Sequence, residues 1–218
     1  MLFVSRNWLA IFTALVATYV GTSFAAPVFI ALGLQEFGLR IYQLYWPLCH
    51  QFAHRSWFLF GQEAFYPAPS FQAITGIDPY SAPGRWAAKD FYGNEALGWK
   101  VALCERDVAI YAGILAGGII YGTLRSRGHR LRSPHWLIYV LVGLAPISID
   151  GFSQLLSQPP YMLPRLPFRE STPVLRILTG SLFGSMNVML AYPYIEKWMR
   201  EVENEKGYKL RRRCYTEG

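Results

Sequence analysis

The sequence predicts an all-α membrane protein with four transmembrane helices, an interfacial helix and a long irregular extracytoplasmic loop. Hydrophobic residues make up 52% of the 218-residue chain and charged residues only 16%, and the mean hydropathy is positive. The apolar residues are concentrated in long runs instead of recurring at the period of a soluble core. We therefore expect residues 1–218 to form a single membrane domain.

Four apolar runs predict the spans, at about residues 8–34, 108–124, 136–156 and 174–198. Each approaches or exceeds the roughly 20 residues with which a helix crosses a bilayer. The first run resembles a secretory signal, because small residues at 23–26 would suit a peptidase. Pro27 follows directly and the apolar run continues beyond it, so we expect a retained span.

The positive charges predict the orientation of these spans. Arginines are concentrated at residues 125–132, between the second and third spans, and lysines and arginines at residues 197–213. Such segments stay preferentially in the cytoplasm, so the N- and C-termini are expected there. The net charge of +7 is explained by these two segments, and no nucleic-acid-binding motif accompanies it.

The extracytoplasmic segment between the first two spans has two parts. Residues 39–46 are aromatic and apolar, which favours a helix at the membrane interface. Residues 62–100, which we call the insertion, are rich in proline and glycine but also in aromatic residues. The insertion is therefore expected to be an irregular but ordered cap, because disordered segments are poor in aromatics.

Polar residues from separate stretches are predicted to meet at one level in the outer leaflet. Candidate metal or disulfide residues are Cys49, His50, Cys104 and Asp107. The accompanying polar cluster comprises Arg55, Arg106, Asp150, Gln154, Arg176 and Thr179. Charges beside a bilayer are costly unless paired, so we expect the arginines at 106 and 176 to face the aspartates at 107 and 150. The other halves of the predicted spans carry no comparable set.

Three kinds of chemistry are open to the cysteines. An oxidising compartment favours a disulfide between Cys49 and Cys104. The four candidate residues also have the ligand types of a divalent metal such as zinc, although adjacent Cys49 and His50 side chains diverge and rarely bind one ion together. A reactive thiol assisted by His50 is the third alternative.

The polar blocks resemble the DUF2085 family of predicted prokaryotic membrane proteins. The resemblance rests on Cys49-His50-Gln51 with Arg55-Ser56, Phe58 and Gly61-Gln62; Cys104-x-Arg106-Asp107 with Ile110-Tyr111-x-Gly113; Pro146 with Asp150-Gly151-x-x-Gln154; and Arg169-x-Ser171-Thr172 with Arg176 and Thr179-Gly180-x-x-x-Gly184. It covers residues 49–184 and implies a multi-pass protein of the prokaryotic cell membrane, without an established activity. The insertion departs from the shorter connector expected of the family.

Two functions follow as hypotheses. The first is a structural or accessory subunit of a larger membrane assembly, with membrane lipids and other membrane protein subunits as partners. The alternative is an extracytoplasmic metal-binding or thiol-redox membrane enzyme. Phosphate-binding loops, nucleophile elbows and dinucleotide fingerprints are absent, so no catalytic residue is named and the question of enzymatic activity stays open. Transport is disfavoured because the sequence shows no midplane polar site and no inverted repeat.

Overall fold

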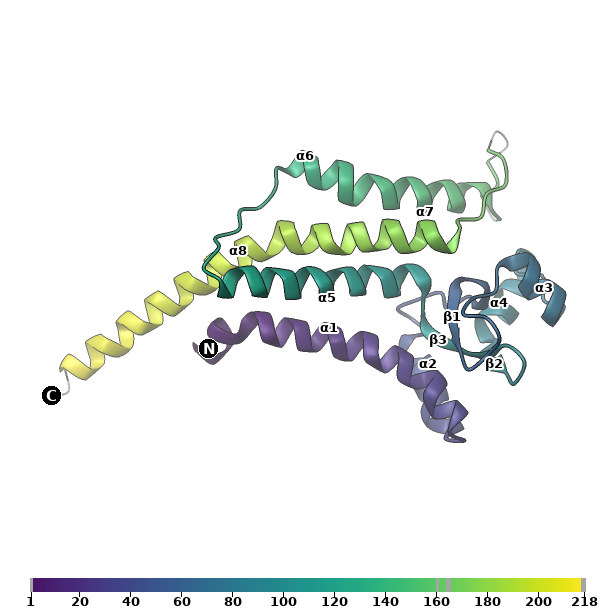
Figure 1. The fold of residues 1–218 in the computed structure, drawn as a ribbon, viewed down its shortest axis with the longest axis horizontal. Coiled ribbons are helices and arrows are strands. Elements are labelled where there is room, and N and C mark those ends of the chain that lie inside the picture. Colours follow the sequence, from purple (N-terminus) through teal and green to yellow (C-terminus); the bar gives the residue numbers. More distant parts are fainter. Residues whose placement is uncertain (1, 160, 164–165, 217–218) are drawn as a thin grey trace.

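Four long helices form the bundle of the protein. The structure is a computed structural model that describes residues 2–159, 161–163 and 166–216, with side chains described up to residue 205. Within these residues, four helices are long and apolar enough to cross a membrane: Leu2–Ala31, Glu105–Ser126, Trp136–Ser157 and Pro173–Glu205. They run alongside one another (Figure 1). Each of the four predicted spans thus corresponds to a candidate membrane helix, with shifted ends.

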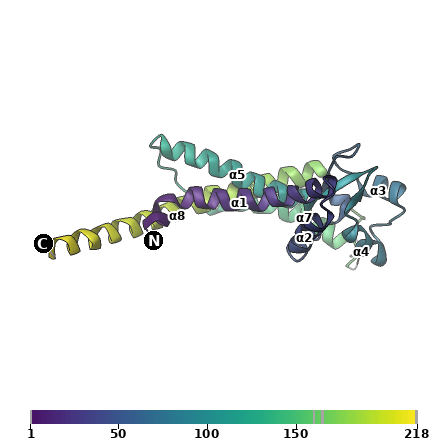
Figure 2. The same ribbon diagram turned by 90° about the horizontal axis from the view of Figure 1, so that it is seen from below.

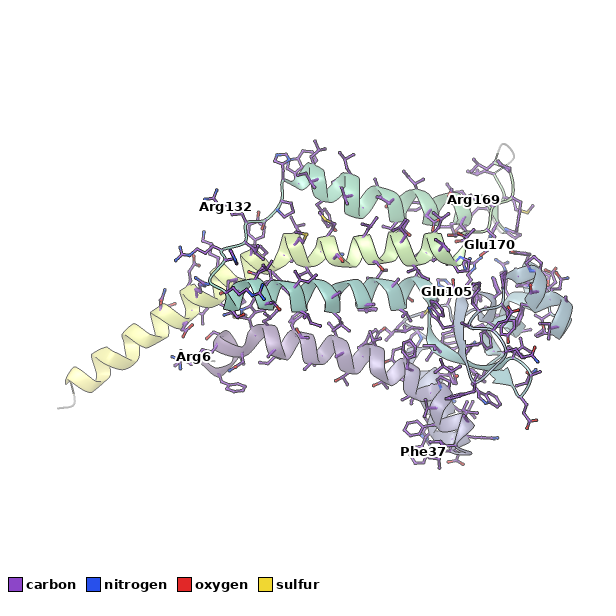
Figure 3. All side chains as sticks on the ribbon, in the orientation of Figure 1. Arg6, Phe37, Glu105, Arg132, Arg169 and Glu170 are labelled. Atoms are coloured by element: carbon purple, nitrogen blue, oxygen red, sulfur yellow. The ribbon has the colours of Figure 1, made fainter. Side chains whose placement is uncertain are left out.

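The first helix, α1 (Leu2–Ala31), passes Pro27 without interruption. It ends earlier than predicted, because Gly33 adopts a positive φ of 82° and turns the chain into α2 (Gln35–Tyr45). Tyr42 and Tyr45 of α2 are buried against the end of α1. Phe37, at the far tip of α2, points away from the bundle and is 62% exposed (Figure 3).

The third span contains a local change of helix type. It comprises α6 (Trp136–Ile138), the π-helical segment η2 (Tyr139–Leu144) and α7 (Ala145–Ser157). Pro146 has no N–H to donate and its ring crowds the preceding turn. This accounts for the wider, π-helical hydrogen bonding between residues five apart just before it.

The centre of the bundle is the pair α5 (Glu105–Ser126) and α8 (Pro173–Thr216). Their backbones approach closely because glycines face the partner helix. A Cβ atom placed on Gly184 would lie 2.0 Å from the carbonyl oxygen of Ile110, and one on Gly180 would lie 2.9 Å from that of Arg106. Helices that pack in a membrane use small residues in this way.

The segment between α2 and α5 is not an irregular loop, which corrects the prediction. It contains η1 (Ala53–Arg55), β1 (Ser56–Leu59), α3 (Ala68–Thr75), α4 (Ala82–Asp90), β2 (Gly93–Asn94) and β3 (Gly98–Cys104). We call residues 53–104 the cap. The strands form an antiparallel sheet in the order β1-β3-β2, which lies at one end of the bundle (Figures 1 and 2).

The cap has its own hydrophobic core, formed by Phe58, Tyr66, Phe71 and Leu97. These aromatic residues pack mainly within the cap, where the prolines and glycines provide the turns between short elements. Short strands between such residues carry little periodicity, so the pattern did not reveal a sheet.

The opposite end of the bundle also holds a buried charge, which the sequence did not suggest. The Trp8 indole N–H donates to Glu196 at 2.9 Å, and Glu196 forms ion pairs with Arg125 at 3.1 Å and Arg200 at 2.7 Å. Both the N-terminus and the C-terminus lie on this side of the molecule (Figure 1). We call it the terminal end, and the other the cap end.

Candidate functional site

A cavity of about 560 Å³ lies at the cap end, where the cap meets α5, α7 and α8. Eight of the ten residues singled out from the sequence line it: Cys49, His50, Arg55, Cys104, Arg106, Asp107, Gln154 and Arg176. The other two do not. Asp150 does not line the cavity but forms an ion pair with Arg106, which does. The Thr179 hydroxyl donates to the Leu175 carbonyl within α8.

Strand pairing brings the two cysteine motifs together. Ser56 of β1 lies opposite Cys104 at the end of β3, so the chain that precedes β1 passes beside the start of α5. The Cys104 backbone N–H donates to the Cys49 sulfur at 3.4 Å. The first motif is thus held against the N-terminal turn of a transmembrane helix.

Three ligand-type side chains converge at this point. The sulfur atoms of Cys49 and Cys104 and a carboxylate oxygen of Asp107 all lie within 4.8 Å of one another. His50 is exposed and stacks near Phe52, with ring centroids 5.6 Å apart. Among the four candidate ligands, the structure therefore gathers three and leaves His50 outside the group.

Both cysteines are free thiols, so the predicted disulfide is not formed in this structure. The hydrogen bond with Cys49 and burial together raise the pKa of the Cys104 thiol well above its usual value, and the nearby charge of Asp107 adds to the effect. Reactive cysteines have a lowered pKa. The arrangement thus weakens the reactive-thiol hypothesis for Cys104.

One ion-pair network is centred on Asp150, a buried residue of α7. Its carboxylate accepts hydrogen bonds from Arg106 at 2.6 Å, Arg169 at 2.9 Å and Ser171 at 2.7 Å. These bonds join α5, α7 and the segment before α8. Several charge-assisted bonds to one buried carboxylate offset the cost of removing it from water.

A second network surrounds Arg176, and here the predicted partners were wrong. Arg176 pairs with Glu105 at 3.0 Å and also with Glu170, whereas we expected an aspartate. Glu170 accepts further bonds from Arg55 at 2.9 Å and Gln154 at 2.7 Å. Figure 3 shows Glu105, Arg169 and Glu170 at the cap end.

The sequence contains a signal for both glutamates. Glu105 stands inside the second cysteine motif and Glu170 directly follows Arg169. Each lies at or just before the start of a membrane helix, where an anion is favoured by the helix dipole.

His54 is a cavity residue to which the sequence assigned no role. It is 3% exposed, and in the described part of the chain neither ring nitrogen has a hydrogen-bond partner. Its ring stacks on Phe52 with centroids 5.7 Å apart. Burial holds the pKa of His54 well below its usual value, and the charges of Arg55 and Arg176 lower it further. The imidazole is therefore neutral near pH 7.

The insertion completes the cavity. Pro79, Tyr80 and Arg85 contribute to its lining. Arg85 donates to the Pro159 carbonyl at 2.7 Å, and the Tyr80 hydroxyl donates to Glu170 at 3.3 Å. Burial raises the pKa of Tyr80, and the Glu170 charge raises it further, which keeps the hydroxyl protonated as a donor.

Comparison with known proteins gives a family without an assigned activity. The family model described as "Predicted membrane protein (DUF2085)" matches residues 95–190. An uncharacterized protein of Methanocaldococcus jannaschii is 26% identical over 175 residues, which cover 78% of this chain and 81% of that protein. No solved structure matches the chain.

The family match includes the blocks from Cys104 to Gly184 and begins after the Cys49–Gln62 block. It contains α5, α7 and most of the membrane part of α8, and hence much of the ion-pair network. Over residues 95–190, this chain is similar to the DUF2085 family of predicted membrane proteins.

Proposed function

We propose that this protein is a membrane metalloprotein in which Cys49, Cys104 and Asp107 bind one divalent ion such as zinc. The observation that carries the proposal is the convergence of two thiols and a carboxylate within 4.8 Å on the wall of a cavity. Thiolate and carboxylate groups are ordinary zinc ligands. Two ligand atoms of a tetrahedral zinc ion lie about 3.3–3.8 Å apart, so only small side-chain movements are needed.

The position of the three residues indicates what kind of metal site this is. Structural zinc sites are closed by four protein ligands, whereas sites with three protein ligands leave a position for water or a substrate. Here the three residues border a cavity of about 560 Å³. An ion held by these three residues would therefore keep one position open toward the cavity, where it would polarise a bound group.

We further propose that the cavity faces the extracytoplasmic side of a prokaryotic cell membrane. Arg6 and Arg132 lie at the terminal end, opposite Glu105 and Glu170 (Figure 3). The arginine-rich segment after α5 also lies at the terminal end (Figure 1). Short segments rich in positive charge favour the cytoplasmic side. In this orientation, the exposed apolar residues of α2 lie at the outer interface with lipid.

The accessory-subunit hypothesis depends on a docking role for the insertion. Tyr66, Phe71 and Leu97 of the insertion are buried in the cap core, and other insertion residues line the cavity. This arrangement favours an internal role for the insertion, in closing the site, over a role in binding another subunit.

The metal content of the purified protein tests the proposal. After extraction in a mild detergent, we expect about one zinc-like ion per chain by elemental mass spectrometry. Cys49→Ser, Cys104→Ser and Asp107→Asn should each reduce this content strongly, because each removes one of three protein ligands.

The matched control is His50→Ala, which changes another lining residue outside the three-ligand group. This variant should retain the metal. Absence of a stoichiometric ion in the wild type, or metal content that the cysteine substitutions leave unchanged, would contradict the proposal.

A further inference from the structure

Two residues that line the cavity have buried polar atoms without hydrogen-bond partners. His54 is buried, and in the described residues neither of its ring nitrogens is bonded. The Arg106 Nε is also buried without a partner, although another nitrogen of the same guanidinium binds Asp150. A neutral imidazole has one N–H and one lone pair, and an arginine Nε only donates. Buried polar groups of this kind need a partner.

One arginine that lines the cavity has no carboxylate partner among the described residues. Arg85 lines it and donates to a backbone carbonyl, and no carboxylate among the described residues lies within ion-pair distance of it. The other three lining arginines are each paired with a carboxylate: Arg55, Arg106 and Arg176. Asp107, the lining carboxylate, faces the two cysteines.

We propose that the arginine and histidine side of this cavity binds a phosphate group. A phosphate offers several acceptor oxygens and negative charge, which match the unbonded donors and the unpaired arginine of residues that line this cavity. None of its residues is a proposed metal ligand.

The size of the cavity indicates that the phosphate carries an organic group. A volume of about 560 Å³ lies in the range of small-molecule sites and greatly exceeds that of inorganic phosphate. Leu48, Leu155 and Tyr161 supply apolar surface to the same cavity. All three are largely exposed at the cap end of the apolar bundle, so the phosphate belongs either to a phospholipid headgroup or to a soluble phosphate compound.

Two measurements on the purified protein distinguish these sources. Native mass spectrometry of the protein mixed with phosphatidylglycerol micelles detects a retained phospholipid. Calorimetry of delipidated protein with inorganic phosphate detects binding of the free anion. A retained lipid that millimolar phosphate does not displace identifies the lipid source, and calorimetric binding without lipid retention identifies the soluble one.

Three variants test the residues. His54→Phe keeps a planar ring among the aromatic neighbours but removes both nitrogens, and Arg85→Gln removes the unpaired charge. Each should weaken phosphate binding about tenfold, the usual effect of losing one charge-assisted bond. Arg130→Gln, an exposed arginine beyond α5, should bind as the wild type does.

The double variant Cys49→Ser/Cys104→Ser separates this site from the metal site. We expect it to lose metal and to keep phosphate binding. Loss of phosphate together with metal would overturn the inference, because the ion would then hold the anion. Equal binding by the wild type, His54→Phe and Arg85→Gln, or no binding in either measurement, would overturn it as well.

Discussion

At the scale of single residues, the cap end depends on buried groups whose partners come from distant parts of the chain. Arg176 and Glu105 form an ion pair in which their side chains are only 4% and 1% exposed. The two residues lie 71 positions apart in the chain. A buried pair of this kind contributes modest net stability, but removal of one partner leaves a charge without compensation. The pair therefore fixes how α5 and α8 meet more than how stable the bundle is.

Lys100 is a second buried charge, and it lacks a carboxylate partner among the described residues. Its side chain is fully buried, and its ammonium donates to the Gln51 carbonyl at 2.7 Å and to the Lys89 carbonyl. Burial lowers the pKa of Lys100 from 10.5 to about 7, with a smaller opposing effect from Asp90.

This lowered pKa makes stability depend on pH. Between pH 7 and 10.5 the unfolded lysine stays protonated while the folded one is neutral, so the unfolded state binds more protons and stability rises with pH. Below pH 7 the lysine is charged in both states, and the cost of burying this charge lowers the free energy of unfolding by its full amount. That amount is a few kcal/mol, at about 1.4 kcal/mol for each pKa unit. Thermal unfolding in detergent should show this rise in the wild type.

Lys100→Met should flatten that rise, because it removes the titrating group. Lys89→Met, at a partly exposed neighbour, is the control and should keep the slope. An unchanged slope in Lys100→Met would show that another group causes the pH dependence.

At the scale of elements, the direct connection of β3 to α5 positions the site. Cys104 ends the strand and Glu105 begins the helix. The sheet therefore fixes Cys104 against Cys49, while the helix fixes Arg106 against α7. One short segment thus belongs to both the thiol group and the ion-pair network, so we expect the two to be mechanically coupled.

The α5–α8 contact gives a prediction about packing. Gly184→Ala should lower the free energy of unfolding by about 1–3 kcal/mol, because the new Cβ would lie 2.0 Å from the Ile110 carbonyl oxygen. Gly21→Ala in α1 is the matched control, since nothing lies within 4 Å of its Cβ position. It should be neutral or stabilise by up to about 1 kcal/mol. Equal effects in thermal unfolding would contradict close helix contact.

At the scale of the whole molecule, the two ends of the bundle differ in character. The cap end has the sheet, the cavity and the phosphate and metal sites that we propose, whereas the terminal end has both chain termini and the arginine-rich segment (Figures 1 and 3). This asymmetry supports one orientation in the membrane.

Labelling of single cysteines in whole cells checks the orientation. In a background without the native cysteines (Cys49→Ser, Cys104→Ser and Cys214→Ser), Glu95→Cys in the cap should react with a membrane-impermeant maleimide. Arg130→Cys at the terminal end should react only after the cells are permeabilised. Both replaced residues are exposed in the structure, so the membrane alone should decide their reactivity. The reverse pattern would invert the proposed topology.

The sequence by itself determined the membrane class, the four candidate spans and eight of the residues that line the cavity at the cap end. Apolar runs and polar motifs are local properties, and the position of a residue along a span follows from its number. For that reason the amino-acid sequence alone was enough to place Cys49, Cys104, Arg106 and Gln154 near one another.

Only the tertiary structure decided the sheet, the partners of each charge and the role of His54. Strand pairing between β1 and β3 joins residues 40 to 48 positions apart, and no local pattern states which strands pair. The choice of Glu105 and Glu170 over an aspartate for Arg176 depends on helix rotation, which side-chain packing sets. The physical reason is the same in each case, because these features arise from contacts between elements that are separate in the chain.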